Sequence, residues 1–559
     1  MMSSEEVIEI SDDSDSEYKA GTSGSKQPHT SGFVDLDSDE ESDESSDSVQ
    51  WVEEESESEP DLDCDHWDDD CTICDLKPST KLIQGYHLMP TCIRDLPEKR
   101  MKMSAELNDV FCNSEYVQKL CDNFQNGNAF IDKECEMILD PWKVLVCNDV
   151  VSNVDVLNNV REEFNEISWN ERKMDLYEFF QSRDLRKEQG FKNINCIYEL
   201  IKGDLMKFVA KLCGLELVDA SATCSFYSDS DFLLVHDDQQ DTRAVAFVLY
   251  LTGEEGWEEN WGGALELFDR NSQNQPNVCT RRVIPKNNRL VLFPVSDYSY
   301  HQVNEVRSKN YCRLSINGWF HTKEPLKFET PTYEKPKCGI LSDTLQIVEN
   351  NEINLEDWIG PRFLNEAYVG DIQGYMEESS QLSLATFFNS NKMKRVVEVL
   401  NSQDLVWKHM GPPNRHNYEY LDLEQELPQI LKNFLALFKS TDFMQLLMQY
   451  THLELVNFRY ELQKWTPGCY SLLGDQEAKN RLDLSISMGD LEVIGGKTQY
   501  VTLEDEVQQA LVTIDVDGSL NLVYGDTAKY ISFVSHQSKS KAYYTLTASY
   551  FETEEDDEN

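Results

Sequence analysis

The alternation of apolar and polar positions is most regular between Cys224 and Phe320, where short β-forming runs are separated by turn-forming residues. The runs read CSFYSDSDFLLVHDD, RAVAFVLYL, WGGALELFD, NRLVLFPVSDYSYHQVNEV and YCRLSINGWF. They are rich in Val, Ile, Leu, Phe and Tyr, while Asp, Asn, Gly and Pro stand between them. This pattern predicts an antiparallel barrel or a double sheet.

The stretch from Glu106 to Cys213 has a different period. Apolar residues recur at helical spacing in Tyr116–Leu120, Val154–Phe164 and Leu205–Ala210. Such spacing places the apolar side chains on one face of a helix. We therefore expect this stretch to be mainly helical and to form a layer packed outside the barrel.

The second half of the chain repeats this order loosely. Segments with helical spacing of apolar residues, Leu382–Leu400 and Leu427–Tyr450, precede β-rich runs. The β-rich runs are Leu455–Leu462, Leu482–Met488, Ala510–Val516, Leu520–Tyr524 and Tyr543–Phe551. A Pro-containing, charged stretch at Lys323–Asn354 has the composition of an interdomain linker. The pattern predicts a second barrel after that linker.

Charge is distributed unevenly over the 559 residues. The formal net charge is −52, and Met1–Asp75 alone holds 27 acidic and two basic residues. This block is rich in Ser, Asp and Glu and poor in aromatic residues, so it cannot bury enough apolar surface to fold. We expect a disordered acidic tail. The overall charge favours basic protein partners and disfavours direct binding to nucleic acid, whose phosphates it repels.

The cysteines and the first residues bear on the compartment. The 15 cysteines are scattered along the chain, which is typical of free thiols in a reducing environment. The first residues, MMSSEEVIEISDD, contain no apolar h-region, and no later segment has the length of a membrane span. The expectation is an intracellular protein without a membrane association.

Two short apolar segments interrupt the acidic tail. Val7–Ile10 and Phe33–Leu36, which contains Val34–Leu36, are each followed by serines among acidic residues. Such segments resemble SUMO-interacting motifs, which add a strand to the edge of a sheet. The alternative is that these apolar residues occur by chance in a solvated tail. The serines beside acidic residues also resemble sites for an acidophilic kinase.

A cluster of four thiol and imidazole side chains follows in CDHWDDDCTIC. Its members are Cys64, His66, Cys71 and Cys74. Their spacing matches no common zinc finger, and little apolar sequence surrounds them. Free thiols are the favoured interpretation, with a structural zinc ion as the alternative.

Three residues in the first β-rich region could hold a metal ion. His236 and Asp238 are two apart at the end of one run, and His301 stands at the end of another. Residues i and i+2 of a strand point to the same face, so His236 and Asp238 can bind one ion together, with His301 reaching it from an opposing strand. Two imidazoles and one carboxylate leave open positions on Fe(II) for a co-substrate and dioxygen. The alternative is that these are ordinary residues, because an H-x-D pair is common by chance.

Arg313 strengthens the iron interpretation. It lies on the same face of its predicted strand as Ser315 and Asn317. A guanidinium inside a barrel needs an anion, and its planar fork matches a carboxylate. The distal carboxylate of 2-oxoglutarate would supply that anion, with a hydroxyl from Ser315 and a phenol from Tyr250 as further donors. Together these features indicate a 2-oxoglutarate oxygenase.

The motifs HDD, FVLYL, GGALEL, FPVS, HQVNEV and RLSINGWF resemble those of the eukaryotic Fe(II)- and 2-oxoglutarate-dependent prolyl 3-hydroxylases of the ribosome. Asp175–Ser182 is similar to a segment that precedes the barrel in that family, and Gly411–Asn414 to a segment of its second domain. The likeness spans roughly Asn108 to Glu552.

This resemblance implies an α+β fold with two tandem double-stranded β-helix barrels, of the jelly-roll or cupin type, and flanking helices. It implies that His236, Asp238 and His301 are the iron ligands and that Tyr250 and Arg313 hold 2-oxoglutarate. Dioxygen would be the co-substrate and ascorbate the reductant. The implied reaction is C3 hydroxylation of a proline in a small-subunit ribosomal protein at the decoding centre. That reaction would affect translation and place the enzyme in the cytoplasm and nucleus.

The expected domains are an acidic tail at 1–103, a catalytic barrel at 104–322, a linker at 323–357, a second barrel at 358–553 and an acidic end at 554–559. Aligning the two β-rich halves by eye puts Gly474, Gln476 and Tyr544 where the first has His236, Asp238 and Arg313. The second barrel is then non-catalytic, and His536 is interpreted as a turn residue.

Two alternative functions remain open from the sequence. One is the same chemistry on another residue, for example by a lysyl or histone-directed oxygenase. The other is a non-catalytic scaffold that responds to oxygen or SUMO. The intact set of His236, Asp238, His301 and Arg313 argues against the scaffold.

Overall fold

The described part of the chain comprises a strand at 82–84 and residues 104–552, as seen in a computed structural model. Short gaps within it are at 189, 254–255, 329–332, 337–338, 343, 348–352, 474–479 and 505–506. All of these residues belong to one compact unit, Asp68–Asn559. The acidic tail with Val7–Ile10 and Phe33–Leu36, the cluster of Cys64, His66, Cys71 and Cys74, the end at 554–559, and Gly474 and Gln476 lie outside the described residues.

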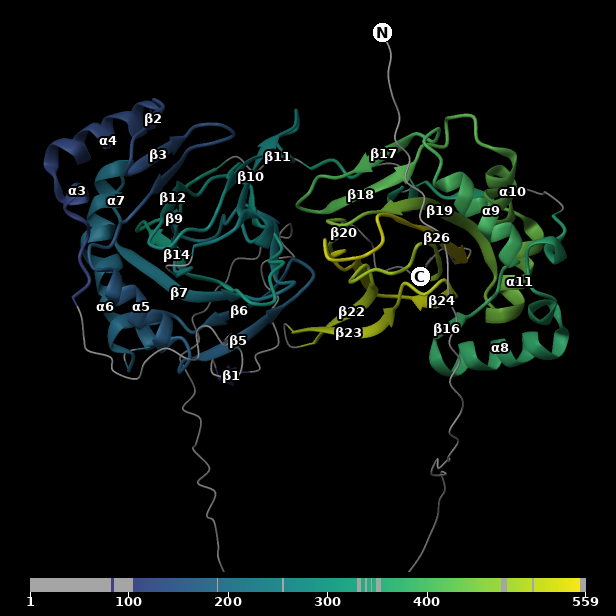
Figure 1. The fold of residues 1–559 in the computed structure, drawn as a ribbon. Coiled ribbons are helices and arrows are strands. Elements are labelled where there is room, and N and C mark those ends of the chain that lie inside the picture. Colours follow the sequence, from purple (N-terminus) through teal and green to yellow (C-terminus); the bar gives the residue numbers. More distant parts are fainter. Residues whose placement is uncertain are drawn as a thin grey trace, which may run out of the picture. The chain divides into compact units, whose positions relative to one another are not determined.

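The first half of the unit is built on a 14-stranded antiparallel sheet (Figure 1). Its strands are β1 Leu82–Gln84, β2 Phe130–Ile131, β3 Cys135–Ile138, β4 Val144–Cys147, β5 Ser168–Lys173, β6 Tyr177–Ser182, β7 Asp219–Tyr227, β8 Phe232–His236, β9 Arg243–Tyr250, β10 Leu265–Arg270, β11 Pro276–Val283, β12 Leu290–Pro294, β13 His301–Val303 and β14 Arg313–His321. The order is β11-β10-β13-β8-β6-β7-β14-β9-β12-β4-β3-β2, with β5 pairing β1 and β6.

This sheet closes into two layers. Tyr250 and Phe293 on β9 and β12 pack in one buried cluster with Leu265 and Leu267 on β10. Strands far apart in the sheet order therefore face each other across a shared interior, the arrangement of a jelly roll. The fold is accordingly a β-rich, jelly-roll-like one with flanking helices.

Helices cover the outer face of the larger layer. They are α3 Asp109–Cys112, α4 Ser114–Asn126, α5 Val154–Glu163, α6 Lys192–Leu200 and α7 Met206–Cys213, the last two joined by a π-helical turn, Ile201–Leu205. Their apolar residues share a core with Leu314 and Ile316 of β14. The residues between them, Arg313 and Ser315, therefore face the interior of the jelly roll.

The caps of these helices follow from the sequence. The side chain of Asn113 accepts from the backbone N–H of Tyr116 at the start of α4, and Gly127 ends that helix at φ 65°. Asn153 caps α5 in the same way through Asp155. Asparagine at the N-cap and a left-handed glycine after the last turn are strong helix boundaries.

The helices expected at Tyr116–Leu120, Val154–Phe164 and Leu205–Ala210 are confirmed as α4, α5 and α7, with Phe164 as the C-cap of α5 and Leu205 in the π-helical turn before α7. Helices make up most of the regular structure in Glu106–Cys213, as expected, but the expectation omits β2 to β6, which this stretch also contributes. These strands are only two to six residues long, and one of them reads SWNERK, so they carry little periodic signal. Pairing with distant strands, rather than local propensity, decides their structure.

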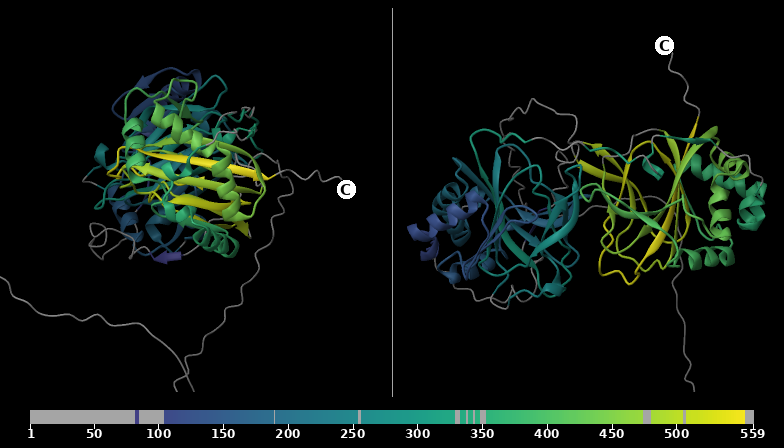
Figure 2. Two further views of the ribbon diagram at one scale, coloured as in Figure 1. Left: turned by 90° about the vertical axis from the view of Figure 1, so that its right-hand side faces the viewer. Right: turned by 90° about the horizontal axis from the view of Figure 1, so that it is seen from above.

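The second half is built on a 12-stranded antiparallel sheet. Its strands are β15 Gln346–Ile347, β16 Gln381–Leu384, β17 Trp407–Met410, β18 His416–Leu421, β19 Leu455–Trp465, β20 Tyr470–Ser471, β21 Arg481–Gly489, β22 Thr498–Glu504, β23 Val507–Ile514, β24 Leu520–Gly525, β25 Ala528–Ile531 and β26 Tyr543–Glu552. Helices α8 Glu366–Ser379, α9 Ser390–Leu400, α10 Gln429–Phe438 and α11 Thr441–Thr451 cover one of its faces (Figure 2).

A buried carboxylate lies inside this second sheet. Glu461 of β19 accepts a hydrogen bond from the Tyr418 hydroxyl at 2.9 Å and one from the Gln463 amide at 2.8 Å. Burial raises the pKa of Glu461 to about 7, although these bonds oppose the rise.

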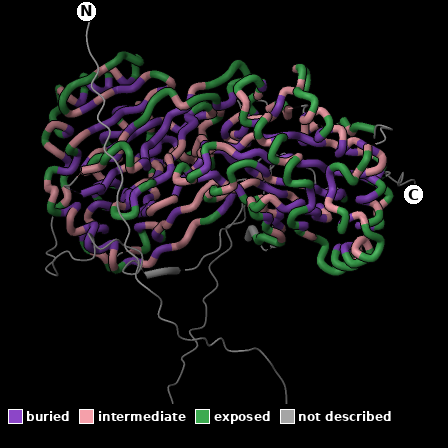
Figure 3. Tube along the Cα trace, turned by 45° about the vertical axis from the view of Figure 1, so that its right-hand side comes forward, coloured by how far each residue is buried: buried purple, intermediate pink, exposed green. Residues whose placement is uncertain are grey.

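The two sheets together contain most of the buried residues, whereas exposed residues gather on helices and loops (Figure 3). No helix in the described residues is long and apolar enough to cross a membrane.

Candidate metal and co-substrate site

The structure brings His236, Asp238 and His301 together. One ligand atom from each lies within 4.8 Å of the others, and no other such group of three occurs in the described residues. The two carboxylate oxygens of Asp238 each lie 3.4 Å from one histidine Nε2 atom. The imidazole rings of His236 and His301 have their centroids 4.2 Å apart. This is the donor set of a two-histidine, one-carboxylate metal site.

His236 and Asp238 do not meet as alternate residues of one strand. β8 ends at His236, and Asp238 lies beyond it with φ 65°, in the left-handed region that Asp adopts more readily than most residues. His301 is the direct partner of His236 on the neighbouring strand β13. A register shift between His301 and Val303 marks a β-bulge, a feature that re-aims side chains near functional sites.

Each histidine is held by a backbone carbonyl. The Nδ1 atom of His236 lies 2.8 Å from the carbonyl oxygen of Leu234, and that of His301 lies 2.7 Å from the carbonyl oxygen of Ser299. A carbonyl only accepts, so Nδ1 carries the proton in both rings. The lone pair of each Nε2 atom is then free to bind a metal ion, in the orientation that the carbonyl fixes.

The electrostatics favour an ionised carboxylate. Burial raises the pKa of Asp238, but the two histidines beside it more than offset this, and the net pKa is held well below its usual range. Burial lowers the pKa of His236, whereas the Asp238 carboxylate raises it, and the net shift is upward. The Asp238 carboxylate and the His236 imidazole thus each favour the charged form of the other.

Arg313 lies at the start of β14 and is only 2% exposed. Its Nε atom donates to the carbonyl of Gly263 at 2.9 Å, and its guanidinium lies over the rings of Tyr227 and Tyr250 at 4.9 and 5.0 Å. Its Nη1 atom lies 3.5 Å from the Ser315 hydroxyl. Within the part of the chain that the structure describes, no acidic side chain forms an ion pair with it. A buried cation of this kind calls for an anionic ligand.

Three hydroxyls form a row beside this arginine. Ser315 on β14 is paired with Ser225 on β7 and with Tyr250 on β9. The hydroxyls of Ser225 and Tyr250 are buried and make no hydrogen bond in the structure. A carboxylate accepts several such bonds, so a small dicarboxylate fits the donors that surround Arg313.

Ser225 was not among the residues expected from the sequence. The sequence does contain a pattern that indicates Ser225, because the alternation in CSFYSD places it on the interior face two residues before Tyr227. Its pairing with Ser315, however, depends on the register of two strands ninety positions apart in the chain.

Two aromatic side chains form a wall beside His301. Trp142 and Phe293 pack edge-on against His301, with ring centroids 6.2 and 4.9 Å from it. The indole N–H of Trp142 is buried and has no partner. This wall keeps water from one side of the triad and offers a donor to a ligand there.

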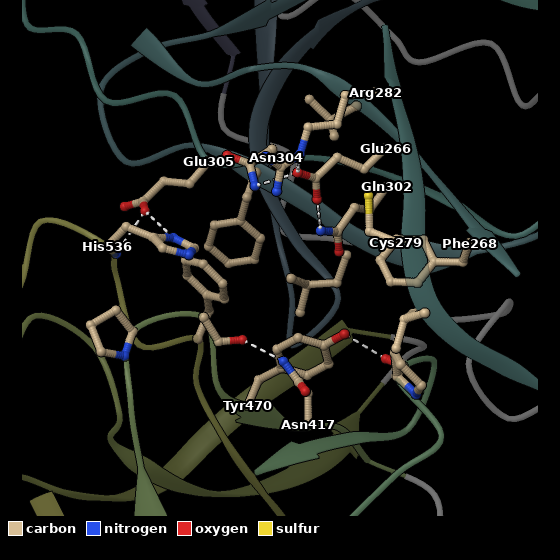
Figure 4. Close-up of a pocket in the computed structure, with 18 of the residues that line it drawn as sticks. Glu266, Phe268, Cys279, Arg282, Gln302, Asn304, Glu305, Asn417, Tyr470 and His536 are labelled. Atoms are coloured by element: carbon tan, nitrogen blue, oxygen red, sulfur yellow. Dashed lines mark hydrogen bonds and ion pairs between the residues drawn. The ribbon is translucent and has the colours of Figure 1, made fainter. Parts of the chain in front are cut away.

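A separate cavity of about 520 Å³ is lined by residues of both halves of the chain (Figure 4). Glu266, Gln302 and Asn304 line it from the first half, and Asn417, Tyr470 and His536 from the second. None of the three candidate metal ligands borders it. The cavity is therefore distinct from the metal site, and its size alone does not make it the place of the chemistry.

Two comparisons with protein families agree with this geometry. The profile of the 2OG-Fe(II) oxygenase superfamily matches residues 222–321, the stretch that contains the triad and Arg313. The profile described as oxoglutarate and iron-dependent oxygenase degradation C-term matches residues 350–558. The fold and the site thus define a 2-oxoglutarate- and Fe(II)-dependent oxygenase.

Curated relatives narrow the class. The chain is 31% identical over 487 residues to prolyl 3-hydroxylase sudestada1 of Drosophila melanogaster. This match covers 78% of this chain and 89% of that protein. It is 33% identical over 373 residues to prolyl 3-hydroxylase OGFOD1 of Mus musculus, covering 66% of each. The protein belongs to the prolyl 3-hydroxylase family and is an Fe(II)- and 2-oxoglutarate-dependent prolyl hydroxylase. A solved Pseudomonas putida prolyl-4-hydroxylase is similar at 20% identity, over 37% of this chain and 99% of that one, with a TM-score of 0.28.

The by-eye alignment of the two halves is wrong at Tyr544. Its hydroxyl donates to the carbonyl of Leu400 at 2.8 Å, and its ring lies in the core that the helices share with the second sheet. Arg313 has the opposite orientation, toward the sheet interior. Tyr543, one residue earlier, is packed apart from that helical core, with Trp465.

His536 is more than a turn residue. Its backbone N–H and its Nδ1 atom both lie within hydrogen-bonding distance of the Glu305 carboxylate, which belongs to the first half of the chain. This contact joins residues 231 positions apart, and no local pattern in the sequence signals it.

Proposed function

We propose that His236, Asp238 and His301 hold the Fe(II) ion and that Arg313, Tyr250, Ser315 and Ser225 hold 2-oxoglutarate. The observation that carries this assignment is the burial of Arg313 without an acidic partner in the described residues, beside two hydroxyls that also lack partners. These donors lie on the interior face of the same sheet that carries the triad. An isolated metal site would not need them.

The protein residues have separate tasks in the reaction. When bound, iron supplies the oxidative chemistry by which 2-oxoglutarate and dioxygen become succinate and carbon dioxide and one oxygen atom enters the prolyl ring. Leu234 and Ser299 orient the two imidazoles through their carbonyls. Arg313 and the hydroxyl row orient the dicarboxylate. Trp142 and Phe293 exclude water from one side. Ascorbate is the proposed reductant that returns iron to the ferrous state.

We further propose that the substrate is a proline of a basic small-subunit ribosomal protein, hydroxylated at C3. The names of the Drosophila and mouse relatives support the position on the ring. The net charge of −52 supports a basic partner, because it attracts cationic polypeptides over long distances. Such a reaction would act on translation, and we propose the cytoplasm and nucleus as its location.

The second sheet is proposed to be a second, non-catalytic jelly-roll barrel at 358–553, joined by the linker at 323–357 to a catalytic barrel at 104–322. Its support is the absence, from the described residues of this half, of a second group of three metal ligands. For the acidic tail we propose SUMO binding through Val7–Ile10 and Val34–Leu36, which rests on sequence alone.

The test is incubation of the purified protein with Fe(II), 2-oxoglutarate and a panel of peptides from ribosomal proteins. We expect a gain of one oxygen atom on a proline-containing basic peptide, located at C3 by fragmentation and amino-acid analysis. A panel of lysine-containing and histone peptides serves as the comparison. Modification of those peptides instead would overturn the proposed substrate while leaving the cofactor assignment intact.

A further inference from the structure

The loop after β13 carries a buried carboxylate that reaches the other half of the chain. Glu305 is 1% exposed. It accepts a hydrogen bond from the hydroxyl of Ser535. It also accepts hydrogen bonds from the backbone N–H of His536 at 2.7 Å and from the Nδ1 atom of His536 at 2.9 Å, and Figure 4 shows this pair of residues. We call these three bonds the Glu305 contact. A buried carboxylate with three donors is a strong point of attachment, because losing the donors leaves an uncompensated charge.

The backbone of Glu305 supports a two-glycine loop. The N–H of Gly263 is shared between the carbonyls of Asn304 and Glu305, at 3.1 and 3.2 Å. Gly262 has φ 72°, and a Cβ atom there would lie 1.9 Å from the Glu305 carbonyl oxygen. The two segments therefore touch at backbone distance, and a shift of Glu305 must displace this loop.

The same loop holds Arg313. The carbonyl of Gly263 accepts from the Nε atom of Arg313 at 2.9 Å, and a Cβ atom on Gly263 would lie 3.2 Å from the Cδ atom of that arginine. Other than the 3.5 Å approach to Ser315, this is the hydrogen bond that the structure gives the guanidinium. The direction of the fork thus depends on where Gly263 lies.

These contacts form a continuous path from the second half of the chain to the co-substrate site. We propose that Glu305 is a positioning residue, through which the Ser535–His536 turn sets the position of Gly263 and the orientation of Arg313 toward 2-oxoglutarate. The inference rests on the proposed role of Arg313. It gives the second half a defined part in the reaction although its described residues contain no group of three side chains placed to hold a metal ion.

A different contact between the two halves provides a matched control. The buried carboxylate of Asp175 accepts from the backbone N–H of Leu473 at 2.9 Å. This contact also joins a buried acid of the first half to the second. Within the residues that the structure describes, neither Asp175 nor Leu473 forms a hydrogen bond or ion pair with Gly262, Gly263 or Arg313. Its loss should weaken the attachment of the halves without moving the arginine.

The experiment compares Glu305→Ala, Glu305→Gln, His536→Ala and Asp175→Ala with the parent and with Arg313→Ala. The full-length proteins are loaded with Mn(II), and 2-oxoglutarate binding is measured by calorimetric titration, with metal affinity and melting temperature recorded in parallel. His536 has a partly exposed side chain, so its truncation preserves the fold. Glu305→Gln keeps one acceptor for the turn.

We expect Glu305→Ala to weaken 2-oxoglutarate binding by about 10- to 100-fold, by analogy with the loss of a residue that orients a metal ligand. His536→Ala and Glu305→Gln should lose less. Metal affinity should stay at the parental value. In turnover, the KM for 2-oxoglutarate should rise while kcat at saturation stays close to that of the parent. Asp175→Ala should lower the melting temperature and leave 2-oxoglutarate binding unchanged.

Two results would overturn the inference. One is parental 2-oxoglutarate affinity in both Glu305→Ala and His536→Ala. The other is an equal loss of 2-oxoglutarate affinity in Asp175→Ala, which would mean that the Glu305 contact contributes only to the stability of the protein. The Arg313→Ala protein separates this failure from that of the proposed function. If it binds 2-oxoglutarate as the parent does, the co-substrate site itself is misplaced, and the positioning role fails with it.

Discussion

His236 and His301 face each other from paired positions on β8 and β13, and each ring is hydrogen-bonded through Nδ1 to a carbonyl two residues earlier in the chain. The two histidines thus present equivalent Nε2 atoms to Asp238 from adjacent strands. A site prepared in this way needs little rearrangement to bind a metal ion, which limits the entropic cost of binding.

Replacing a triad residue should abolish metal binding. We expect Asp238→Ala to lose Fe(II) and Mn(II) affinity by more than about 100-fold and to stop 2-oxoglutarate turnover, because one of three ligands is gone. Equilibrium dialysis with Mn(II) measures this. Asp237→Asn is the matched control, since Asp237 accepts from the Gln239 backbone at 3.0 Å and is not in the triad. An Asp238→Ala protein that still decarboxylates 2-oxoglutarate at the parental rate would contradict the assignment.

Arg313→Ala should weaken 2-oxoglutarate binding without affecting the metal. Loss of a buried, charge-assisted pair costs on the order of 2–5 kcal/mol, which corresponds to a roughly tens- to thousands-fold change in Kd. Arg313→Lys should recover part of this, because an ammonium keeps the charge but not the fork. Titration of the Mn(II)-loaded variants gives both values. Loss of metal in place of 2-oxoglutarate would show that Arg313 has another role.

Tyr250→Phe and Ser225→Ala should reduce affinity for 2-oxoglutarate without reducing stability. Their hydroxyls are buried and unpaired in the structure, so their removal costs no existing hydrogen bond. A hydrogen bond to a charged ligand is worth about 1.5–3 kcal/mol, or about 10- to 100-fold in Kd.

Thermal melting of the ligand-free variants should give values at or above that of the parent. Tyr450→Phe is the control, because the hydroxyl of Tyr450 donates to the Phe363 carbonyl at 2.7 Å. It should lower stability by about 1 kcal/mol and leave 2-oxoglutarate binding unchanged. A lower melting temperature for Tyr250→Phe than for Tyr450→Phe would mean that its hydroxyl has a structural partner.

Gly262→Ala should destabilise the protein by more than about 2 kcal/mol, because the added Cβ meets the Glu305 carbonyl and the residue is held at positive φ. Gly203→Ala is the contrasting substitution. It has no atom within 4 Å of the added Cβ and lies in helical backbone, so a gain of about 0.5–1 kcal/mol is expected. Chemical denaturation measures both, and equal effects would contradict the close approach at Gly262.

Glu461 should make stability depend on pH. Its pKa is raised from 4.5 to about 7 in the folded state. The folded protein therefore binds this proton more tightly than the unfolded chain does. The associated stability is fully present below pH 4.5 and is lost as the pH rises through about 7, by about 3 kcal/mol in total. Relative to Glu461→Gln, the parent should lose stability over this range, as measured by denaturation at several pH values. A constant difference would show that the carboxyl is ionised throughout.

The sequence predicted the residues of the site better than the way in which they meet. His236, Asp238, His301 and Arg313 were identified by their types and spacing, and the structure brings the first three together. The expectation that Asp238 shares a strand with His236 does not hold, because β8 ends at the histidine. A left-handed residue and a bulge depend on how β8 pairs with β13, which a linear pattern does not contain.

The helices and strands show the same division. Long runs such as those of α10, α11 and β26 were located closely, since each helix buries one face over several turns and β26 is buried along almost its whole length. The short strands β2 to β6 were not, because their structure depends on partners elsewhere in the sheet. Ser225 and the Glu305 contact were missed for the same reason, as both depend on residues at least ninety positions away.

The Glu305 contact also constrains how this protein can change over generations. A substitution of Glu305 alone leaves the buried Ser535 hydroxyl and the His536 N–H without their acceptor, and substitution of the two turn side chains leaves the acid with only the backbone N–H as a donor. Lineages that tolerate one change are therefore expected to have acquired the other. The two positions should vary together across descendants of a common ancestor, and each half should be poorly exchangeable between distant species unless its counterpart is transferred with it.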